Sequence, residues 1–172
     1  MNQYFKSKDV LDLYLHLDDL GIKIWLDGGW GVDALLSKQT RLHSDLDIIV
    51  QQQDVFKLRE FLGSLGYQNI ERNDTSDWNF VLGNDKGYEV DVHVIIFDDH
   101  GNGIYGPVEK GIFYPEKSLL AEGEIDGVIV RCLTPEYQVK SHTGYKSSEK
   151  DFKDVHALCE KFNIECPREY QL

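Results

Sequence analysis

The chain has 172 residues, enough to bury one substantial core, and its 41% hydrophobic and 28% charged residues are typical of a globular protein. Its formal net charge of -12 argues against nucleic-acid binding, because phosphate backbones attract clusters of Lys and Arg. No apolar run approaches the ~20 residues that a membrane-spanning helix needs, so we expect no membrane contact.

The amino-terminal and cysteine patterns indicate a cytoplasmic protein. The first nine residues are polar and lack the apolar segment of a secretory signal. Three cysteines, an odd number, show no paired metal-ligand spacing, which fits a reducing compartment. The sequence leaves the oligomeric state open.

The first third of the chain predicts helices alternating with strands. Apolar residues recur at helical spacing over 8–20, and again over 55–65 before a glycine. Between these segments we expect a short alternating strand over 22–27, a glycine turn over 28–31, a helix over 32–36 and a strand over 45–50.

The remainder predicts mainly strands followed by helices. Strands are expected over 67–72, 78–82, 88–97 and 128–132, with a hairpin turn at 84–87 and a loop at 98–106. Thr134 and Pro135 are typical of a helix start, and a last helix is expected over 149–162. This order predicts an α/β (α+β) fold with a mixed sheet flanked by helices.

Two carboxylates on the strand over 45–50 form a candidate metal site. Residues two apart on a strand share a face, so Asp45 and Asp47 can direct both carboxylates to one point, while Leu46 lies on the other face. Mg²⁺ prefers oxygen ligands and usually takes one or two carboxylates together with substrate phosphates. Asp45 and Asp47 are therefore expected to bind Mg²⁺.

A third carboxylate lies on the strand over 88–97, where Asp91 and His93 share a face. If this strand lies beside the first, Asp91 would join Asp45 and Asp47 and would bind a second metal or take a proton from an attacking hydroxyl. A half-polar strand is equally typical of a solvent-facing sheet, so the spacing alone leaves both interpretations open.

The segment Gly28-Gly29 lies upstream of the metal strand and offers backbone N–H groups to phosphate oxygens. A simpler interpretation is that it only turns the chain. Asp33 is expected on a helix surface. Lys150 either forms a surface pair with Asp154, four residues on, or faces a triphosphate as a point charge.

Together these motifs resemble the lincosamide nucleotidyltransferases, small antibiotic-resistance enzymes of the polymerase-beta-like superfamily, with the aminoglycoside 2″-nucleotidyltransferase as a near relative. The likeness rests on 26–33 (LDGGWGVD), 41–47 (RLHSDLD) and Asp91-x-His93, and extends through Cys132, 142–145 and 149–154. One departure is Val94, where the lincosamide enzymes have proline after the histidine, and it leaves the acceptor open.

The resemblance implies a nucleotidyltransferase core over 1–132 and a small helical part over 133–172 packed on it. It also implies roles for eight residues: Asp45, Asp47 and Asp91 as Mg²⁺ ligands, Gly28, Gly29, Arg41 and Lys150 as contacts of the nucleotide, and Asp91 or His93 as the base.

The expected function is therefore transfer of a nucleoside monophosphate, AMP from ATP by preference, to a hydroxyl of a small cationic antibiotic. A lincosamide is preferred over an aminoglycoside because His93 stands where the aminoglycoside relative has an acid. The negative net charge suits a cationic acceptor. Two rivals remain: a toxin-type nucleotidyltransferase that modifies a protein, and a nucleotide- or metal-binding module without catalysis.

Overall fold

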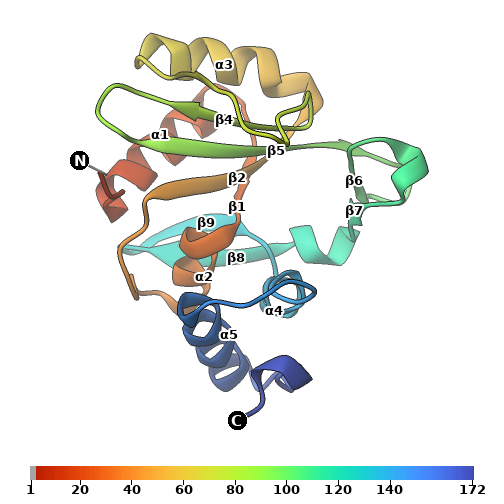
Figure 1. Ribbon diagram of the computed structural model, residues 1–172. Helices are drawn as coiled ribbons and strands as arrows, with labels where there is room; N and C mark the ends of the chain where they lie inside the picture. Colours follow the sequence, from red (N-terminus) through yellow and green to blue (C-terminus); the bar gives the residue numbers. More distant parts are fainter. Residues whose placement is uncertain (1–2) are drawn as a thin grey trace.

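The computed structural model describes residues 3–172, which form one mixed sheet with helices packed against it (Figure 1). The strand order is β3-β4-β5-β2-β1-β9-β8, with β6 and β7 extending from β5. The strands are β1 (Ile24–Leu26), β2 (Asp45–Gln51), β3 (Gln68–Ile70), β4 (Asn79–Gly83), β5 (Glu89–Phe97), β6 (Gly103–Tyr105), β7 (Phe113–Tyr114), β8 (Ala121–Ile125) and β9 (Val128–Cys132). The helices are α1 (Ser7–Asp19), α2 (Gly28–Leu36), α3 (Val55–Ser64), α4 (Pro135–Ser141) and α5 (Glu149–Phe162).

Capping residues mark the starts of the two carboxy-terminal helices. At the start of α5, Ser148 and Asp151 form a capping box, and the helix ends at Asn163 in the left-handed conformation. At the start of α4, the Thr134 side chain accepts from the backbone N–H of Tyr137 and Pro135 occupies the first turn. Both predicted helix starts are confirmed.

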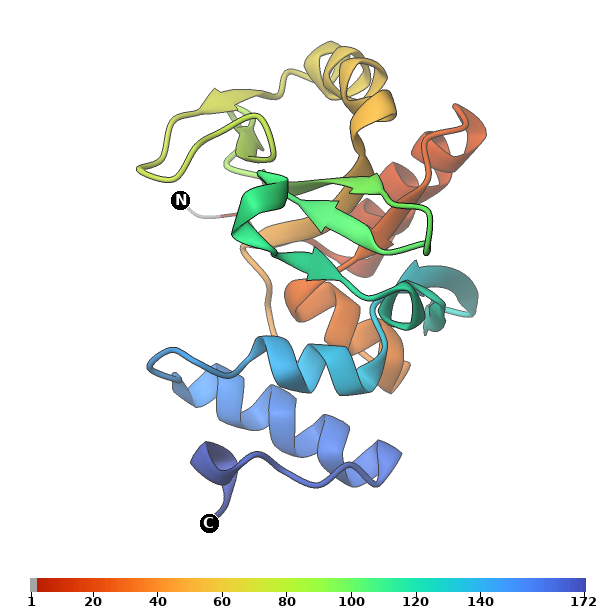
Figure 2. The same ribbon diagram turned by 90° about the vertical axis from the view of Figure 1, so that its right-hand side faces the viewer.

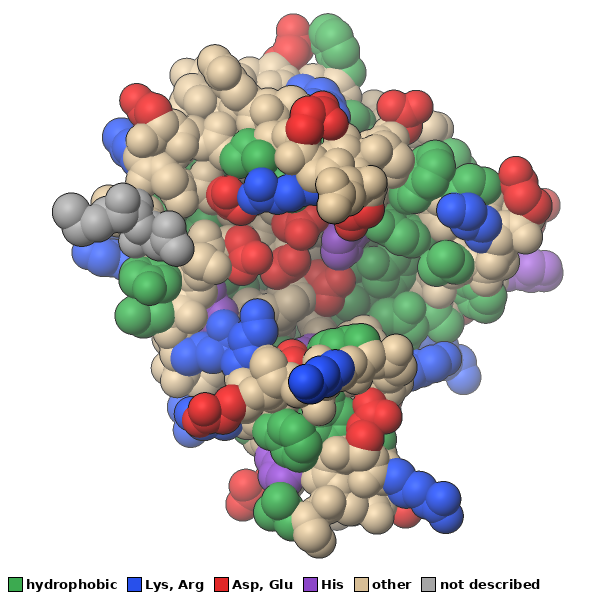
Figure 3. Space-filling view, in the orientation of Figure 1, with side chains coloured by type: hydrophobic (Ala, Val, Ile, Leu, Met, Phe, Trp, Pro, Cys, Tyr) green, Lys and Arg blue, Asp and Glu red, His purple; other side chains and the backbone are tan. Residues whose placement is uncertain are grey.

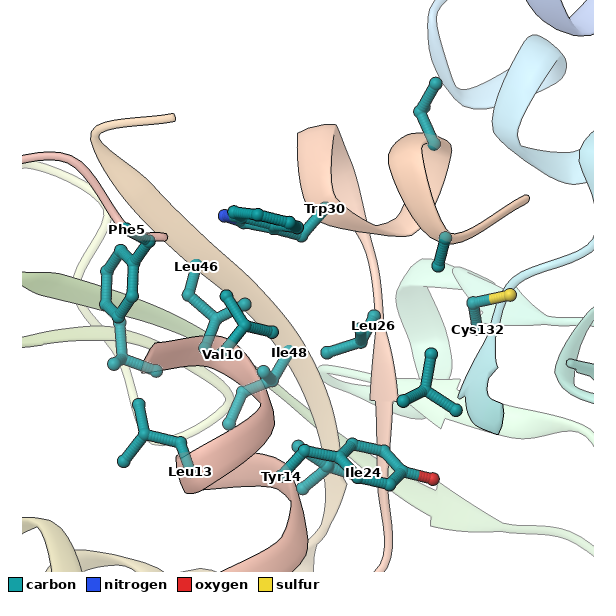
Figure 4. Packing of buried hydrophobic residues seen from close by; sticks show 14 of the residues in the cluster. Phe5, Val10, Leu13, Tyr14, Ile24, Leu26, Trp30, Leu46, Ile48 and Cys132 are labelled. Carbon is teal, nitrogen blue, oxygen red and sulfur yellow. The ribbon is translucent and has the colours of Figure 1, made fainter. Parts of the chain in front are cut away.

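Side chains alternate along the central strands, so that one face of the sheet is apolar and the other is partly polar. Leu46, Ile48 and Val50 of β2 belong to the main core, which α1 covers with residues such as Val10 and Tyr14 (Figure 4). On the opposite face a smaller cluster is centred on Trp25, Ile49, Ile95, Tyr114, Leu119 and Leu133. Asp45 and Asp47 lie on this second face, at the amino-terminal end of β2 and beside the smaller cluster.

Three expectations about local structure are wrong. Residues 28–31 are not a separate turn, because α2 already begins at Gly28 with Asp27 as its N-cap. The expected loop at 98–106 contains β6, which pairs with β5 and β7. Asp33 is not on the helix surface: it is 1% exposed.

The carboxy-terminal helices lie at the end of the molecule away from α3 (Figure 2). There α4 and α5 pack on each other and on α2. Residues 133–172 therefore lie along α2, with Gln138 of α4 next to Gly31 and Lys161 of α5 donating to the backbone oxygen of Leu35. Within residues 3–172, no helix has the length and apolar character needed to cross a membrane.

Candidate active site

The sheet meets the condition set for Asp91, which is that its strand lies beside the strand of Asp45 and Asp47. Strands β2 and β5 are parallel neighbours, with Asp47 opposite Asp91 and Asp45 opposite Glu89. Side chains opposite each other on one face of adjacent strands lie within contact range. Figure 3 shows acidic side chains gathered around a histidine at the middle of this face, with basic side chains on either side of them.

The crowding of negative charge is visible in the pKa values of these carboxyls. Burial, reinforced by the charges of Asp45 and Asp27, raises the pKa of Asp47 to about 8. Burial also raises the pKa of Asp91, with the His93 charge acting in the opposite direction. Carboxylates that repel one another in a partly buried place need a compensating cation.

The chemistry of these carboxylates suits the binding of a divalent cation. Among the described residues, Oδ1 of Asp91 is buried without a hydrogen-bond partner, which leaves a free ligand atom beside Asp47. Residues 3–172 contain no group of three carboxylate, imidazole or thiolate side chains already arranged as a metal site. The ligand set would therefore be completed by nucleotide oxygens and water, as is usual for Mg²⁺.

His93 is held between two carboxylates, one of which the sequence reasoning missed. Its Nδ1 lies 3.7 Å from Oδ2 of Asp27 and its Nε2 lies 3.6 Å from Oδ1 of Asp91. Although burial opposes the charge, Asp27 and then Asp91 raise the pKa of His93 to about 9. Asp27 also accepts a hydrogen bond from the backbone N–H of Gly28 at 2.7 Å. Its place as the N-cap residue before a glycine pair is the feature of the sequence that could have indicated a role for Asp27 in the site.

The first turn of α2 lies directly against the acidic site. A Cβ on Gly28 would lie 2.7 Å from Cγ of Asp47, and Gly28 has φ +55°. A Cβ on Gly29 would lie 2.8 Å from Nη2 of Arg41. Only glycines allow this approach. The backbone N–H of Gly28 is already bonded to Asp27, so Gly29 is the first position of the helix whose N–H could meet a bound anion.

Arg41 lies on the other side of this turn and is held by the carboxy-terminal part. Its Nη2 donates to Oδ2 of Asp154 in α5 at 3.0 Å, and the Asp154 side chain is 4% exposed. Asp154 is therefore buried against Arg41, and the alternative of a surface pair with Lys150 is wrong. Lys150 is exposed one turn before Asp154, on the same side of α5.

Aromatic side chains border the site beyond His93. The Tyr105 ring packs edge-on against the His93 ring, with centroids 5.6 Å apart. The Tyr114 hydroxyl lies 3.4 Å from Nδ1 of His93, and the Tyr114 ring contacts Tyr137 of α4. The sequence reasoning missed these tyrosines, because they come from separate elements.

The chain matches a family model described as aminoglycoside-2''-adenylyltransferase over residues 9–158. It is 32% identical over 149 residues to a lincosamide resistance protein of Staphylococcus haemolyticus, covering 87% of this chain and 89% of that protein.

Two solved structures share the fold. The lincomycin-bound lincosamide antibiotic adenylyltransferase LnuA superposes with a TM-score of 0.79 at 27% identity, covering 95% of this chain and 100% of that one. ANT(2")-Ia in complex with adenylyl-2"-tobramycin superposes with a TM-score of 0.69 at 21% identity, covering 91% of this chain and 88% of that one. The resemblance seen in the sequence is confirmed.

Proposed function

The chain belongs to the aminoglycoside-2''-adenylyltransferase family and is an antibiotic-modifying nucleotidyltransferase, and on that premise we propose that it transfers AMP from ATP to a hydroxyl group of a lincosamide. The observation that carries the proposal is the register of β2 and β5, which sets Asp47 opposite Asp91 beside the start of α2. The preference for a lincosamide rests on the S. haemolyticus relative and on LnuA.

We assign the nucleotide to the start of α2, beside Arg41, which α5 holds through Asp154. Its phosphates would lie against Gly28 and Gly29 and accept a hydrogen bond from the backbone N–H of Gly29, since that of Gly28 is bonded to Asp27; the helix dipole favours negative charge there. Arg41 would face the same phosphates, and Lys150 would add a second positive charge from α5. In this arrangement the core over 1–132 and the helical part over 133–172 both contribute to the nucleotide site.

Asp45, Asp47 and Asp91 would hold Mg²⁺. When bound there, the ion would neutralise charge that develops on the phosphate oxygens. The role of the three carboxylates would be to fix the ion beside the start of α2, where the phosphates are assigned.

The reaction forms one bond and breaks one. The acceptor oxygen bonds to the α-phosphorus, the bond from that phosphorus to the bridging oxygen breaks, and pyrophosphate leaves with the electron pair. The acceptor hydroxyl proton would pass to the pair formed by Asp91 and His93, which lie 3.6 Å apart, and His93 can accept it only in its neutral form. Asp27 would orient His93 within this pair.

The acceptor would lie against the aromatic border of the site. Tyr105 and Tyr114 offer aromatic ring surface next to His93, with Tyr137 behind Tyr114, while Asp91 supplies negative charge for an ammonium group; Glu89 is already paired with Arg72. This combination suits a small cationic molecule that has both a sugar hydroxyl and an apolar portion. A lincosamide meets this description better than an aminoglycoside, which is polar over its whole surface.

The test is a mass-spectrometric assay of the purified protein with ATP, Mg²⁺ and one antibiotic at a time. We expect lincomycin to gain the mass of one AMP, with release of pyrophosphate, and tobramycin to react more slowly. Modification of tobramycin alone would overturn the lincosamide assignment. If both drugs stay unmodified by a protein that binds ATP, the proposed acceptor class is wrong.

A further inference from the structure

A buried polar network lies beneath the first turn of α2. His43 is 2% exposed and Asp33 is 1% exposed. Nε2 of His43 lies 2.5 Å from Oδ2 of Asp33, and the Thr40 hydroxyl donates to Oδ1 of the same carboxylate at 2.6 Å. Both oxygens of one helix residue are thus bonded to the segment 37–44, which connects α2 to β2.

The same histidine packs on the glycine side of the helix. A Cβ on Gly29 would lie 2.5 Å from Cε1 of His43, so the imidazole occupies the space that a side chain at position 29 would need. The Trp30 ring covers it, with ring centroids 4.9 Å apart. His43 is therefore enclosed by α2 from two sides.

Arg41 is two residues before His43, and its guanidinium also lies next to Gly29. Between Ser37 and Ser44 the chain has neither helix nor strand, apart from a single bridge between His43 and Phe5, so the course of this segment depends on side-chain contacts. The Asp33 contacts fix the segment to α2, and Asp154 holds the tip of Arg41 from α5.

A buried ionisable pair is a weak source of stability, because removing both groups from water costs about as much as their attraction returns. A hydrophobic pair would fill the same space. The polar pair does something that packing alone does not: its hydrogen bond defines the direction in which the segment leaves α2.

Building on the nucleotide site proposed above, we propose that His43 and Asp33 are positioning residues that hold Arg41 beside Gly29 at the start of α2. They act on the triphosphate through Arg41. Displacement of a charged group by about 1 Å is enough to lower catalysis strongly, so loss of the pair should disturb triphosphate binding even in a folded protein.

The experiment measures dissociation constants of ATP and AMP by calorimetry, with Mg²⁺ and without acceptor. For His43→Leu we expect ATP to bind ~10-fold more weakly, while AMP, which lacks the β- and γ-phosphates, changes less than ~2-fold. In an Arg41→Ala background, His43→Leu should add less than ~2-fold, because the residue through which it acts is already absent. His43→Gln keeps a donor for Asp33 and should recover part of the ATP affinity.

The matched control is Leu62→Ala, a core truncation in α3 at the other end of the molecule, which should lower the melting temperature without changing the ATP constant. Equal weakening of ATP and AMP by His43→Leu, or effects of His43→Leu and Arg41→Ala that multiply, would overturn the positioning role. If the unchanged protein fails to bind ATP at all, the proposed function fails instead.

Discussion

Asp47 and Asp91 stand directly opposite each other on the parallel strands β2 and β5. Like charges in this relation destabilise a sheet. Burial, followed by the charges of Asp45 and Asp27 and to a smaller extent that of Asp91, raises the pKa of Asp47 to about 8. The fold thus keeps an unfavourable arrangement at a place where a bound cation would relieve it. Sites that sacrifice stability in this way are commonly functional.

Arg41→Ala is expected to act on the nucleotide and not on the acceptor. Because the guanidinium lies over Gly29 at the start of α2, its loss should raise the KM for ATP and lower kcat as charge builds on the leaving pyrophosphate. Steady-state kinetics with each substrate varied in turn measures both constants. A change confined to the acceptor KM would contradict the assignment.

Gly28→Ala is expected to lower activity sharply, because the new Cβ would collide with the Asp47 carboxylate in addition to straining the backbone. Gly21→Ala is the matched control: Gly21 also has positive φ, +76°, but a Cβ there meets nothing within 4 Å. It should cost ~1–2 kcal/mol of stability from strain alone and leave the KM for ATP unchanged. Equal kinetic effects of the two variants would show that strain, not the contact with Asp47, is responsible.

Asp27→Asn is expected to lower the pKa of His93 from its value of about 9 in the metal-free protein, because Asp27 is the leading group that raises it against the effect of burial. A folded-state pKa above the ordinary 6.5 means that the protonated imidazole stabilises the fold. This contribution is complete below pH 6.5 and is lost as the pH rises through 9.

The unchanged protein should therefore lose more stability than Asp27→Asn between pH 6.5 and 9. Urea unfolding at both pH values measures this difference, and NMR titration of the His93 ring protons measures the pKa itself. An ordinary His93 pKa of about 6.5 in the unchanged protein would refute the charge arrangement.

The parts of the site that the sequence predicts well are those governed by local periodicity. Asp45 and Asp47 alternate with buried residues on β2, and Asp91 and His93 do the same on β5, so the shared face follows from the two-residue repeat. The helix over 149–162 has a capping box and a strong apolar stripe, and it forms with those bounds.

The parts that the sequence does not predict depend on contacts between distant segments. Nothing local to Asp33 shows that it will meet His43, ten residues later, inside the protein. Asp154 meets Arg41 across 113 residues. The strands β6 and β7 are only three and two residues long, too short for an alternating pattern to be recognised. They form because β6 pairs with β5 and β7 pairs with β6.

The most direct test of the central claim is the turnover of Asp47→Asn with ATP, Mg²⁺ and lincomycin, measured as adenylylated product by mass spectrometry. The neutral amide removes the repulsion from Asp91, so the variant should fold and should melt no lower than the unchanged protein. It should lose activity by about two orders of magnitude or more, because an amide is a poor replacement for a carboxylate at a Mg²⁺ site. Near-normal turnover by a folded Asp47→Asn protein would contradict metal-dependent nucleotidyl transfer at this site.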